Sequence, residues 1–364
     1  MVALLAEPFY GRSVWGQNLI AGLVNRLKSK RILYRQVAAM QDIPAGCRYM
    51  FVIGTDSDWV KSILESADQK GISPILISND GCQRFSCRYS AVCSDDVNSM
   101  RDLIRWLSAR DKRRIGLYGV NPQSLSDLSR LNGYRAALSP DAVCVYYNHA
   151  SLAQCYEDFF HQPEWPDAVI CTNGFAAVSL VRHLQADRPD ALQKMLIISC
   201  QESRLADCCA GKILNVHLDY CEYGKAAVLL YETIRKADYL SHIVMRMKWN
   251  MQELEQWEMP GSPIAVSAEK KMLSTSAASF YHDSELSEMM HLERLCHELS
   301  PEDAMILNGL LAGCSCTAIA MKYYLTPSTV KYRIRRMMNA CGLKDRTRLL
   351  ELIRQYGLHF PAGE

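Results

Sequence analysis

Short apolar runs alternate with amphipathic stretches from the first residue to about position 250. The apolar runs predict strands at 2–6, 32–37, 49–53, 74–77, 91–93, 114–118, 143–147, 168–171, 196–199, 213–216 and 243–247. The stretches with helical spacing predict helices at 16–28, 59–70, 97–109, 125–138, 151–161, 176–185 and 223–236. This alternation is typical of a doubly wound parallel sheet. The predicted strands are too many for a single sheet of ordinary size, so we expect two α/β lobes. In such folds ligands bind at the carboxyl ends of the strands.

The pattern changes near position 259, where we expect a linker that runs to 284. Residues 260–263 read P-G-S-P, which breaks regular structure, and the sequence after them is rich in Ser and Ala. A helix dense in apolar residues is predicted at 285–299. It suits a connecting or signalling helix that packs against the next module or against a partner helix.

Residues from 300 onward predict a helix-turn-helix. Ser300 and Asp303 have the spacing of a capping box, and Pro301 suits the first helical position. A short helix holds Ile319 and Ala320, and a cap-and-proline pair at 326–327 opens a further helix over 327–340. Two short helices joined by a tight turn form this motif.

The last of these helices has one apolar side and one basic side. At about 100° per residue, the apolar side contains Val330, Ile334, Met337 and Met338. The polar side carries Lys331, Tyr332, Arg335 and Arg336, with Arg333 on the flank. A basic outer face on the second helix of a helix-turn-helix fits the major groove of DNA. The alternative is a solvated basic face on a small helical bundle.

The charge balance favours the DNA-binding interpretation. The net charge of the whole chain is only +2. From position 300 onward, however, nine Lys and Arg residues stand against five Asp and Glu residues, a surplus of four, so the remainder carries −2. The basic surplus therefore lies in the module that would neutralise phosphates.

Residues 299–356 resemble the LuxR/FixJ-type DNA-binding domain without a gap. Residues 299–302 read L-S-P-E against the family's L-T/S-P-R, and 311–315 read L-A-G-C-S against L-A-x-G-x-S. Residues 326–331 read T-P-S-T-V-K against S-P-x-T-V-K, and C-G-L with R-T at 341–347 matches L-G-V-x-x-R-T. The resemblance implies that Lys331, Tyr332 and Arg335 face bases and that Thr329 and nearby basic residues, Arg333 and Arg336 among them, hold phosphates. It also implies a dimer contact through the helix at 345–356. The family commonly has Asn-His or Val-His at 332–333, so the base preference stays open.

Residues 1 to about 255 resemble a periplasmic-binding-protein-like sensor of the lactose/galactose-repressor family. Residues 114–119 and 130–138 read R-I-G-L-Y-G and R-L-N-G-Y-R-A-A-L, similar to R-I-x-x-I-x-G and R-x-x-G-Y-x-x-A-L. Residues 166–173 read P-D-A-V-I-C-T-N, similar to P-D-A-V-x-x-x-N-D, and 214–224 are similar to L-T-T-V-x-Q … M-G. The chain begins on the first strand, so DNA binding is expected at the C-terminal end rather than in front of the sensor.

The second resemblance also implies a ligand site. The residues that match the family's ligand contacts are Tyr10, Trp15, Asp95, Arg130, Asn173 and Gln201. Arg130 matches the family's ligand-gripping Arg, whose guanidinium binds vicinal oxygens or a carboxylate. Gly174 and Gln201 replace residues that are usually acidic, so we expect an acidic or aromatic effector rather than a neutral sugar. The aromatic residues after the first strand could instead be core, and a sensor kept only for dimerisation stays open.

The remaining features argue against other classes of protein. Fifteen Cys residues at irregular spacing, with no export signal or apolar run of transmembrane length, predict reduced thiols in a cytoplasmic protein without a membrane segment. A metal or redox site at Cys82, Cys87 and Cys93, or at Cys208 and Cys209, is the alternative to small core residues. No phosphate loop, nucleophile elbow or His-Glu zinc motif is present, so we expect no enzyme and no cofactor.

Together these patterns predict a one-component transcription regulator. We expect a sensor at 1–258, a linker at 259–284, a connecting helix at 285–299 and a DNA-binding domain at 300–364. The partners would be a small-molecule effector, a second copy of the chain, an inverted-repeat operator in double-stranded DNA, and RNA polymerase if the protein activates. The alternatives are a ligand-blind DNA-binding protein whose sensor-like domain serves dimerisation or a protein partner, and a solute-binding protein with an unrelated tail.

Overall fold

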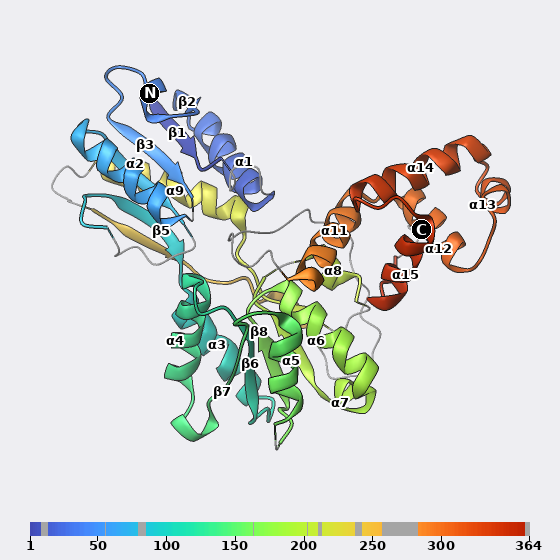
Figure 1. Cartoon of the computed structure of the whole chain (residues 1–364). Coiled ribbons are helices and arrows are strands. Elements are labelled where there is room, and N and C mark those ends of the chain that lie inside the picture. Colours follow the sequence, from blue (N-terminus) through green and yellow to red (C-terminus); the bar gives the residue numbers. More distant parts are fainter. Residues whose placement is uncertain are drawn as a thin grey trace.

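The chain forms two α/β lobes followed by a group of helices (Figure 1). The computed structural model describes residues 1–8, 14–54, 56–78, 85–162, 164–201, 203–209, 213–236, 242–256 and 283–360. Most of the predicted linker at 259–284 lies outside these residues. Both sheets are entirely parallel in their described pairings. The predicted two-lobed, doubly wound architecture is therefore confirmed.

The first lobe has a sheet in the order β11-β5-β4-β3-β1-β2. Its strands are β1 (Val2–Ala6), β2 (Tyr34–Val37), β3 (Tyr49–Ile53), β4 (Ser73–Ile77), β5 (Ser90–Ser94) and β11 (Val244–Met247). Its helices are α1 (Val14–Ser29), α2 (Ser57–Gln69) and α9 (Tyr220–Lys236). Helices α1 and α9 cross closely because glycines face the partner backbone: a Cβ on Gly224 would lie 2.1 Å from the Leu19 carbonyl oxygen.

The second lobe has a sheet in the order β10-β9-β8-β6-β7. Its strands are β6 (Ile115–Val120), β7 (Cys144–Tyr147), β8 (Ala168–Cys171), β9 (Leu196–Ser199) and β10 (Ile213–Asn215). Its helices are α3 (Asp96–Ser108), α4 (Leu125–Ala137), α5 (Leu152–Phe160), α6 (Gly174–Asp187), α7 (Pro189–Lys194) and α8 (Arg204–Asp207). The chain passes between the lobes after β5, after β10 and after β11, where α10 (Gln252–Gln256) contacts β10. Helices α7, α8 and α10 were not predicted because such short segments carry no measurable periodicity.

The C-terminal helices follow the predicted pattern. They are α11 (Ser284–Glu298), α12 (Pro301–Leu311), α13 (Cys316–Lys322), α14 (Pro327–Ala340) and α15 (Arg346–Gln355). The predicted capping box of α12 is confirmed, since Ser300 Oγ accepts from Asp303 N and Asp303 Oδ2 accepts from Ser300 N. Thr326 caps α14 by accepting from Thr329 N at 3.1 Å. Helices α13 and α14, joined by residues 323–326, form the predicted helix-turn-helix.

The C-terminal helices share one hydrophobic core with the second lobe. Phe159 and Leu180 of the lobe belong to the same buried cluster as Leu292, Leu307 and Ile353 of the C-terminal region. Helix α11 lies against α5, α6 and α8 (Figure 1). Its apolar density is thus explained by packing onto the second lobe as well as onto α14. Helix α6 is apolar nearly all round its circumference because both of its faces are covered.

Candidate functional sites

Helix α14 presents a polar outer face. Its buried residues are Val330, Ile334, Met337 and Ala340, close to the predicted apolar side, although Met338 is only partly buried. Lys331 and Arg335 are exposed, and the side chain of Tyr332 is 67% exposed. Arg336 is exposed as well, so four of the six predicted DNA-contacting residues are exposed on this helix. Thr329 lies in the first turn, with its Oγ1 2.8 Å from Thr326 Oγ1.

Two of the predicted DNA-contacting arginines, the partly buried Arg333 and the exposed Arg336, also form ion pairs within the protein. Arg333 Nη1 donates to Asp303 Oδ1 at 3.0 Å and to Ser300 Oγ at 3.1 Å, and Arg336 pairs with Asp303 Oδ2. Asp303 is fully buried. Burial alone would raise the pKa of Asp303, but hydrogen bonds from Ser300 and the two guanidinium groups outweigh it and hold that pKa below its ordinary value. Arg333 and Arg336 thus fasten α14 to α12.

The predicted ligand-gripping Arg130 is also satisfied internally. Its Nη1 donates to Asp127 Oδ1 at 2.9 Å and to the Thr172 carbonyl at 3.1 Å, and only 11% of its side chain is exposed. Burial acts to lower the pKa of Arg130, but the nearby carboxylates of Asp96 and Asp127 raise it above its ordinary value. Arg130 Nε and Asp96 Oδ2 are buried without a hydrogen-bond partner among the described residues. The guanidinium is therefore largely neutralised before any ligand arrives.

The other predicted ligand residues are only partly brought together. Asn173 follows Thr172 and so lies near Arg130, but its Oδ1 caps α6 by accepting from Ala176 N at 2.9 Å. Asp95 accepts from Asn98 Nδ2 at 2.9 Å and lies 3.9 Å from Arg246 of β11. Gln201 follows β9 and is partly buried. Tyr10 lies outside the described residues, and so does the side chain of Trp15, which is in α1.

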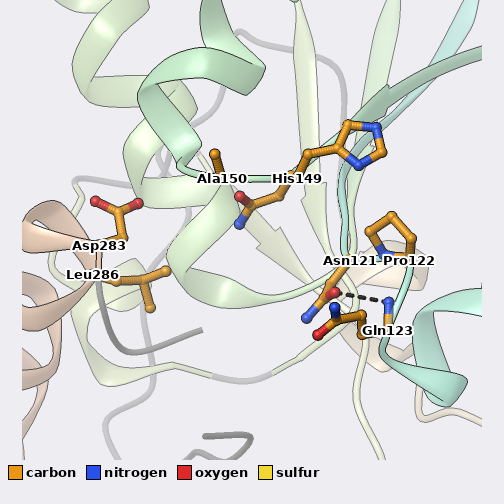
Figure 2. A pocket seen from close by; sticks show the side chains of 8 residues that line it. Asn121, Pro122, Gln123, His149, Ala150, Asp283 and Leu286 are labelled. Carbon is orange, nitrogen blue, oxygen red and sulfur yellow. Dashed lines mark hydrogen bonds between the residues drawn. The ribbon is translucent and has the colours of Figure 1, made fainter. Parts of the chain in front are cut away.

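A cavity of about 220 Å³ lies at a different place, where the second lobe meets α11 (Figure 2). It is lined by residues 121–123 after β6, by residues 148–150 after β7, and by Asp283 and Leu286 at the start of α11. Of the predicted ligand residues whose side chains are described, Asp95, Arg130, Asn173 and Gln201, none lines it. Asn121 and Asn148 are polar residues shortly after the predicted strands at 114–118 and 143–147, a signal that the sequence offered. The contribution of α11 had no such signal, because it depends on long-range packing.

Hydrogen bonds and one ring contact hold the polar side chains of this pocket in place. Asn121 Oδ1 accepts from Gln123 N at 2.9 Å, as Figure 2 shows, and the His149 ring stacks on Tyr147 with centroids 5.3 Å apart. Asp283 Oδ2 accepts from Leu152 N at 3.0 Å, and its Oδ1 accepts from Glu285 N at 3.0 Å. Asp283 therefore caps α11 and the first turn of α5 at once.

Within the described ranges, no group of three or more His, Cys, Asp or Glu side chains is placed to hold a metal ion. Of the predicted cysteine cluster, Cys82 lies outside the described residues, Cys87 is partly buried and Cys93 is buried. No helix in the described part of the chain is both long and apolar enough to cross a bilayer.

Comparison with known proteins gives one sequence relative. No protein-family model matches the chain. Over 162 residues the chain is 25% identical to an HTH-type transcriptional regulator of Lachnoclostridium phytofermentans, a match that covers 42% of this chain and 47% of that protein. The chain thus spans about half the length of the curated relative it matches.

Solved structures resemble the N-terminal portion. The cellobiose complex of the transcriptional regulator CelR has a TM-score of 0.52 at 15% identity, over 68% of this chain and 82% of that chain. A LacI transcriptional regulator from a Rhodococcus species scores 0.51 at 15% identity, over 68% and 95% of the two chains. A LacI family regulator from Enterococcus faecium with bound ribose scores 0.50 at 15% identity, over 69% and 96%. At such identities the likeness concerns the fold alone. The chain thus combines a LacI-family-like periplasmic-binding-protein fold with a C-terminal helical region, and is similar in sequence to a transcriptional regulator.

Proposed function

We propose that this protein is a one-component, small-molecule-responsive transcription regulator that binds double-stranded DNA through a C-terminal, LuxR-type helix-turn-helix. The observation that carries the proposal is the outer face of α14. Lys331, Tyr332 and Arg335 are exposed side by side on the second helix of a helix-turn-helix, while the opposite face is buried. Such a helix can enter a major groove and reach base edges. The sequence relative, an HTH-type transcriptional regulator, supports this function.

The sensor role is supported by the N-terminal fold. Structures with the same fold include regulators with bound cellobiose and ribose. In the proposed mechanism, closure of the two lobes on an effector moves the second lobe and the C-terminal helices packed on it. DNA affinity then changes only by as much as the effector prefers one conformation over the other. No catalytic role is proposed, in line with a relative that is a regulator rather than an enzyme.

We further propose that the protein acts in the cytoplasm as a homodimer on an inverted-repeat operator, with half-sites about 10 bp apart from centre to centre. RNA polymerase would be a partner if the protein activates transcription. The apolar face of α15 is covered within its own chain: Leu349, Leu352 and Ile353 are buried, and Arg182 of α6 lies over the Tyr356 ring just after the helix. A dimer contact through this helix is therefore left to its polar, exposed side.

The proposal is tested by DNA binding of the purified full chain. Fragments selected from genomic DNA supply the operator, and fluorescence anisotropy supplies the affinity. Lys331→Ala and Arg335→Ala should each weaken specific binding by about 1–3 kcal/mol if these side chains read bases. Arg113→Ala, which removes an exposed charge on the second lobe, is the matched control. Unchanged DNA affinity in both α14 variants would contradict the proposal that α14 enters the major groove.

A second candidate function is favoured by one observation. Arg130 is paired with Asp127 and buried, so the sensor cleft lacks the available cation that the family site would use. This favours a ligand-blind DNA-binding protein whose sensor-like lobes serve dimerisation or bind a protein partner. Thermal unfolding against a broad set of metabolites separates the two, because a ligand at 100 times its dissociation constant stabilises by about 2.7 kcal/mol. If no metabolite in the set raises the melting temperature, the ligand-blind function is favoured.

A further inference from the structure

We propose that the pocket between residues 121–123, residues 148–150 and the start of α11 binds a small, uncharged, hydroxyl-rich molecule that contacts α11 directly. This site differs from a cleft formed by the two lobes alone, since the helix that leads to the helix-turn-helix supplies part of its wall. The binding part of the inference stands on the pocket itself. The regulatory part rests on the proposed function.

The chemistry of the lining selects the ligand class. The polar side chains that line the pocket are the amides of Asn121, Gln123 and Asn148, the imidazole of His149 and the carboxylate of Asp283. Amides both donate and accept, and a carboxylate accepts, so vicinal hydroxyl groups can be bound from both sides. No Lys or Arg is among the described residues of the lining. An anionic ligand would therefore meet Asp283 without a compensating cation.

The size and the apolar part of the wall narrow the class further. A volume of about 220 Å³ is below the roughly 300–1,000 Å³ typical of sites for drug-sized ligands. Pro122 and Ala150 give the same pocket an apolar surface, and the almost fully buried Leu286 lies behind its wall. A single sugar ring or a cyclic polyol, with hydroxyl edges and C–H faces, combines these properties.

The charges around Arg130 also argue against an anionic ligand. The one predicted ligand-binding cation, Arg130, faces the two carboxylates of Asp96 and Asp127. That cluster has no positive charge left for an acid. Among the described residues, neither Arg130 nor the lining of the pocket therefore offers an unpaired cation to the acidic effector expected from the sequence.

A ligand in this pocket would act on α11 at its cap. Asp283 joins the start of α11 to the Leu152 amide of α5, and Leu286 follows one turn later. In the first turn of the helix Glu285 accepts from Ser179 Oγ at 3.0 Å, and farther along the helix Glu293 accepts from Leu205 N at 2.8 Å. Helix α11 is thus fixed to the lobe at several points and also contacts α14. A shift at Asp283 would be passed along a rigid helix to the DNA-binding helices.

The test uses the full chain with ribose, glucose and myo-inositol as probes and gluconate as the anionic comparator. Calorimetry at millimolar probe concentration gives affinities, and hydrogen exchange maps protection. We expect at least one uncharged probe to bind and gluconate not to bind. Bound probe should protect amides of 283–290 as well as 148–153. Preferential binding of gluconate, or protection confined to segments outside the pocket, would overturn the inference, and so would failure of all three uncharged probes to bind.

Variants separate the pocket from the fold. Asp283→Ala removes a helix cap and is expected to lower stability, so a loss of binding in this variant could reflect unfolding. His149→Ala and Gln123→Ala remove pocket side chains that cap no helix and are therefore tested beside it. Each of these two should weaken probe binding about tenfold with an unchanged melting temperature. Asp141→Ala, an exposed acid on the same lobe, should bind as the unaltered chain does. Equal affinity in all variants contradicts the site. DNA affinity measured on the same proteins keeps the two proposals apart, because probe binding without DNA binding would contradict only the proposed function.

Discussion

Arg130 and Asp127 form a buried ion pair within one turn of α4, with Nη1 and Oδ1 2.9 Å apart and side chains that are 11% and 6% exposed. Asp127 Oδ2 also accepts from the backbone N–H of Asn121 at 3.0 Å. The pair therefore fixes the loop after β6, which is one wall of the pocket in Figure 2, to the helix that follows it. Arg130 has a structural role whether or not a ligand reaches it.

The first prediction follows from this pair. Arg130→Ala should destabilise the ligand-free protein by about 3–5 kcal/mol, because it leaves Asp127 buried without its cation. Chemical denaturation of the full chain measures the change. Arg135→Ala, a charge removal on the exposed side of the same helix, should be nearly neutral. An Arg130→Ala protein as stable as the unaltered chain would mean that Arg130 serves ligand binding alone.

The second prediction concerns Glu293, which joins α11 to the second lobe. Its carboxylate is buried and accepts from Ser203 Oγ at 2.8 Å, Arg204 N at 3.0 Å and Leu205 N at 2.8 Å. Glu293→Ala should cost about 1–3 kcal/mol, since these donors lose their acceptor. Limited proteolysis should also cut more readily around α11. Glu298→Ala, at the exposed end of the same helix, is the control, and equal digestion of both variants would contradict the proposed anchoring.

The third prediction concerns pH. The pKa of Asp303 is held below its ordinary value of 3.8 in the folded protein. Its stabilising contribution is therefore fully present above that value and is lost as pH falls through the lower folded pKa. Asp303→Asn should accordingly destabilise the protein at neutral pH by about 1–3 kcal/mol, and the difference should shrink at about pH 3. Denaturation of both proteins at the two pH values measures this. A difference independent of pH would mean that the charge of Asp303 is unimportant.

The fourth prediction tests the crossing of α1 and α9. A methyl group on Gly224 would meet the Leu19 carbonyl oxygen at 2.1 Å and the Leu23 amide nitrogen at 2.5 Å, both of them backbone atoms. Because backbone cannot rotate away, Gly224→Ala should cost more than about 3 kcal/mol. The exposed Leu229 on the same helix is the comparison: Leu229→Ala should shift the melting temperature little. A well-folded Gly224→Ala protein of normal stability would show that the two helices can separate.

Local pattern was sufficient for most of the elements. Alternating apolar runs and amphipathic stretches identified the described strands to within a few residues, and the caps Ser300 and Thr326 identified the starts of α12 and α14. These signals are local, because a strand or helix is specified largely by the period of its apolar residues and by its end groups. The exposure of Lys331, Tyr332 and Arg335 followed from the same periodicity, since 3.6 residues per turn decides which side chains share a face.

The tertiary structure alone decided which charged residues are available and where the pocket lies. Periodicity placed Arg336 on the polar side of α14 and could not show that Asp303, on another helix, pairs with it and with Arg333. A family pattern marked Arg130 as a ligand contact and could not show that Asp96 and Asp127 neutralise it. The pocket needs Asp283, which is separated by more than a hundred residues of chain from the loops after β6 and β7. The sequence by itself determined the elements, the two lobes and the basic helix. Contacts between distant segments, which no local pattern encodes, decided the pairing of its charges and the joining of α11 to the second lobe.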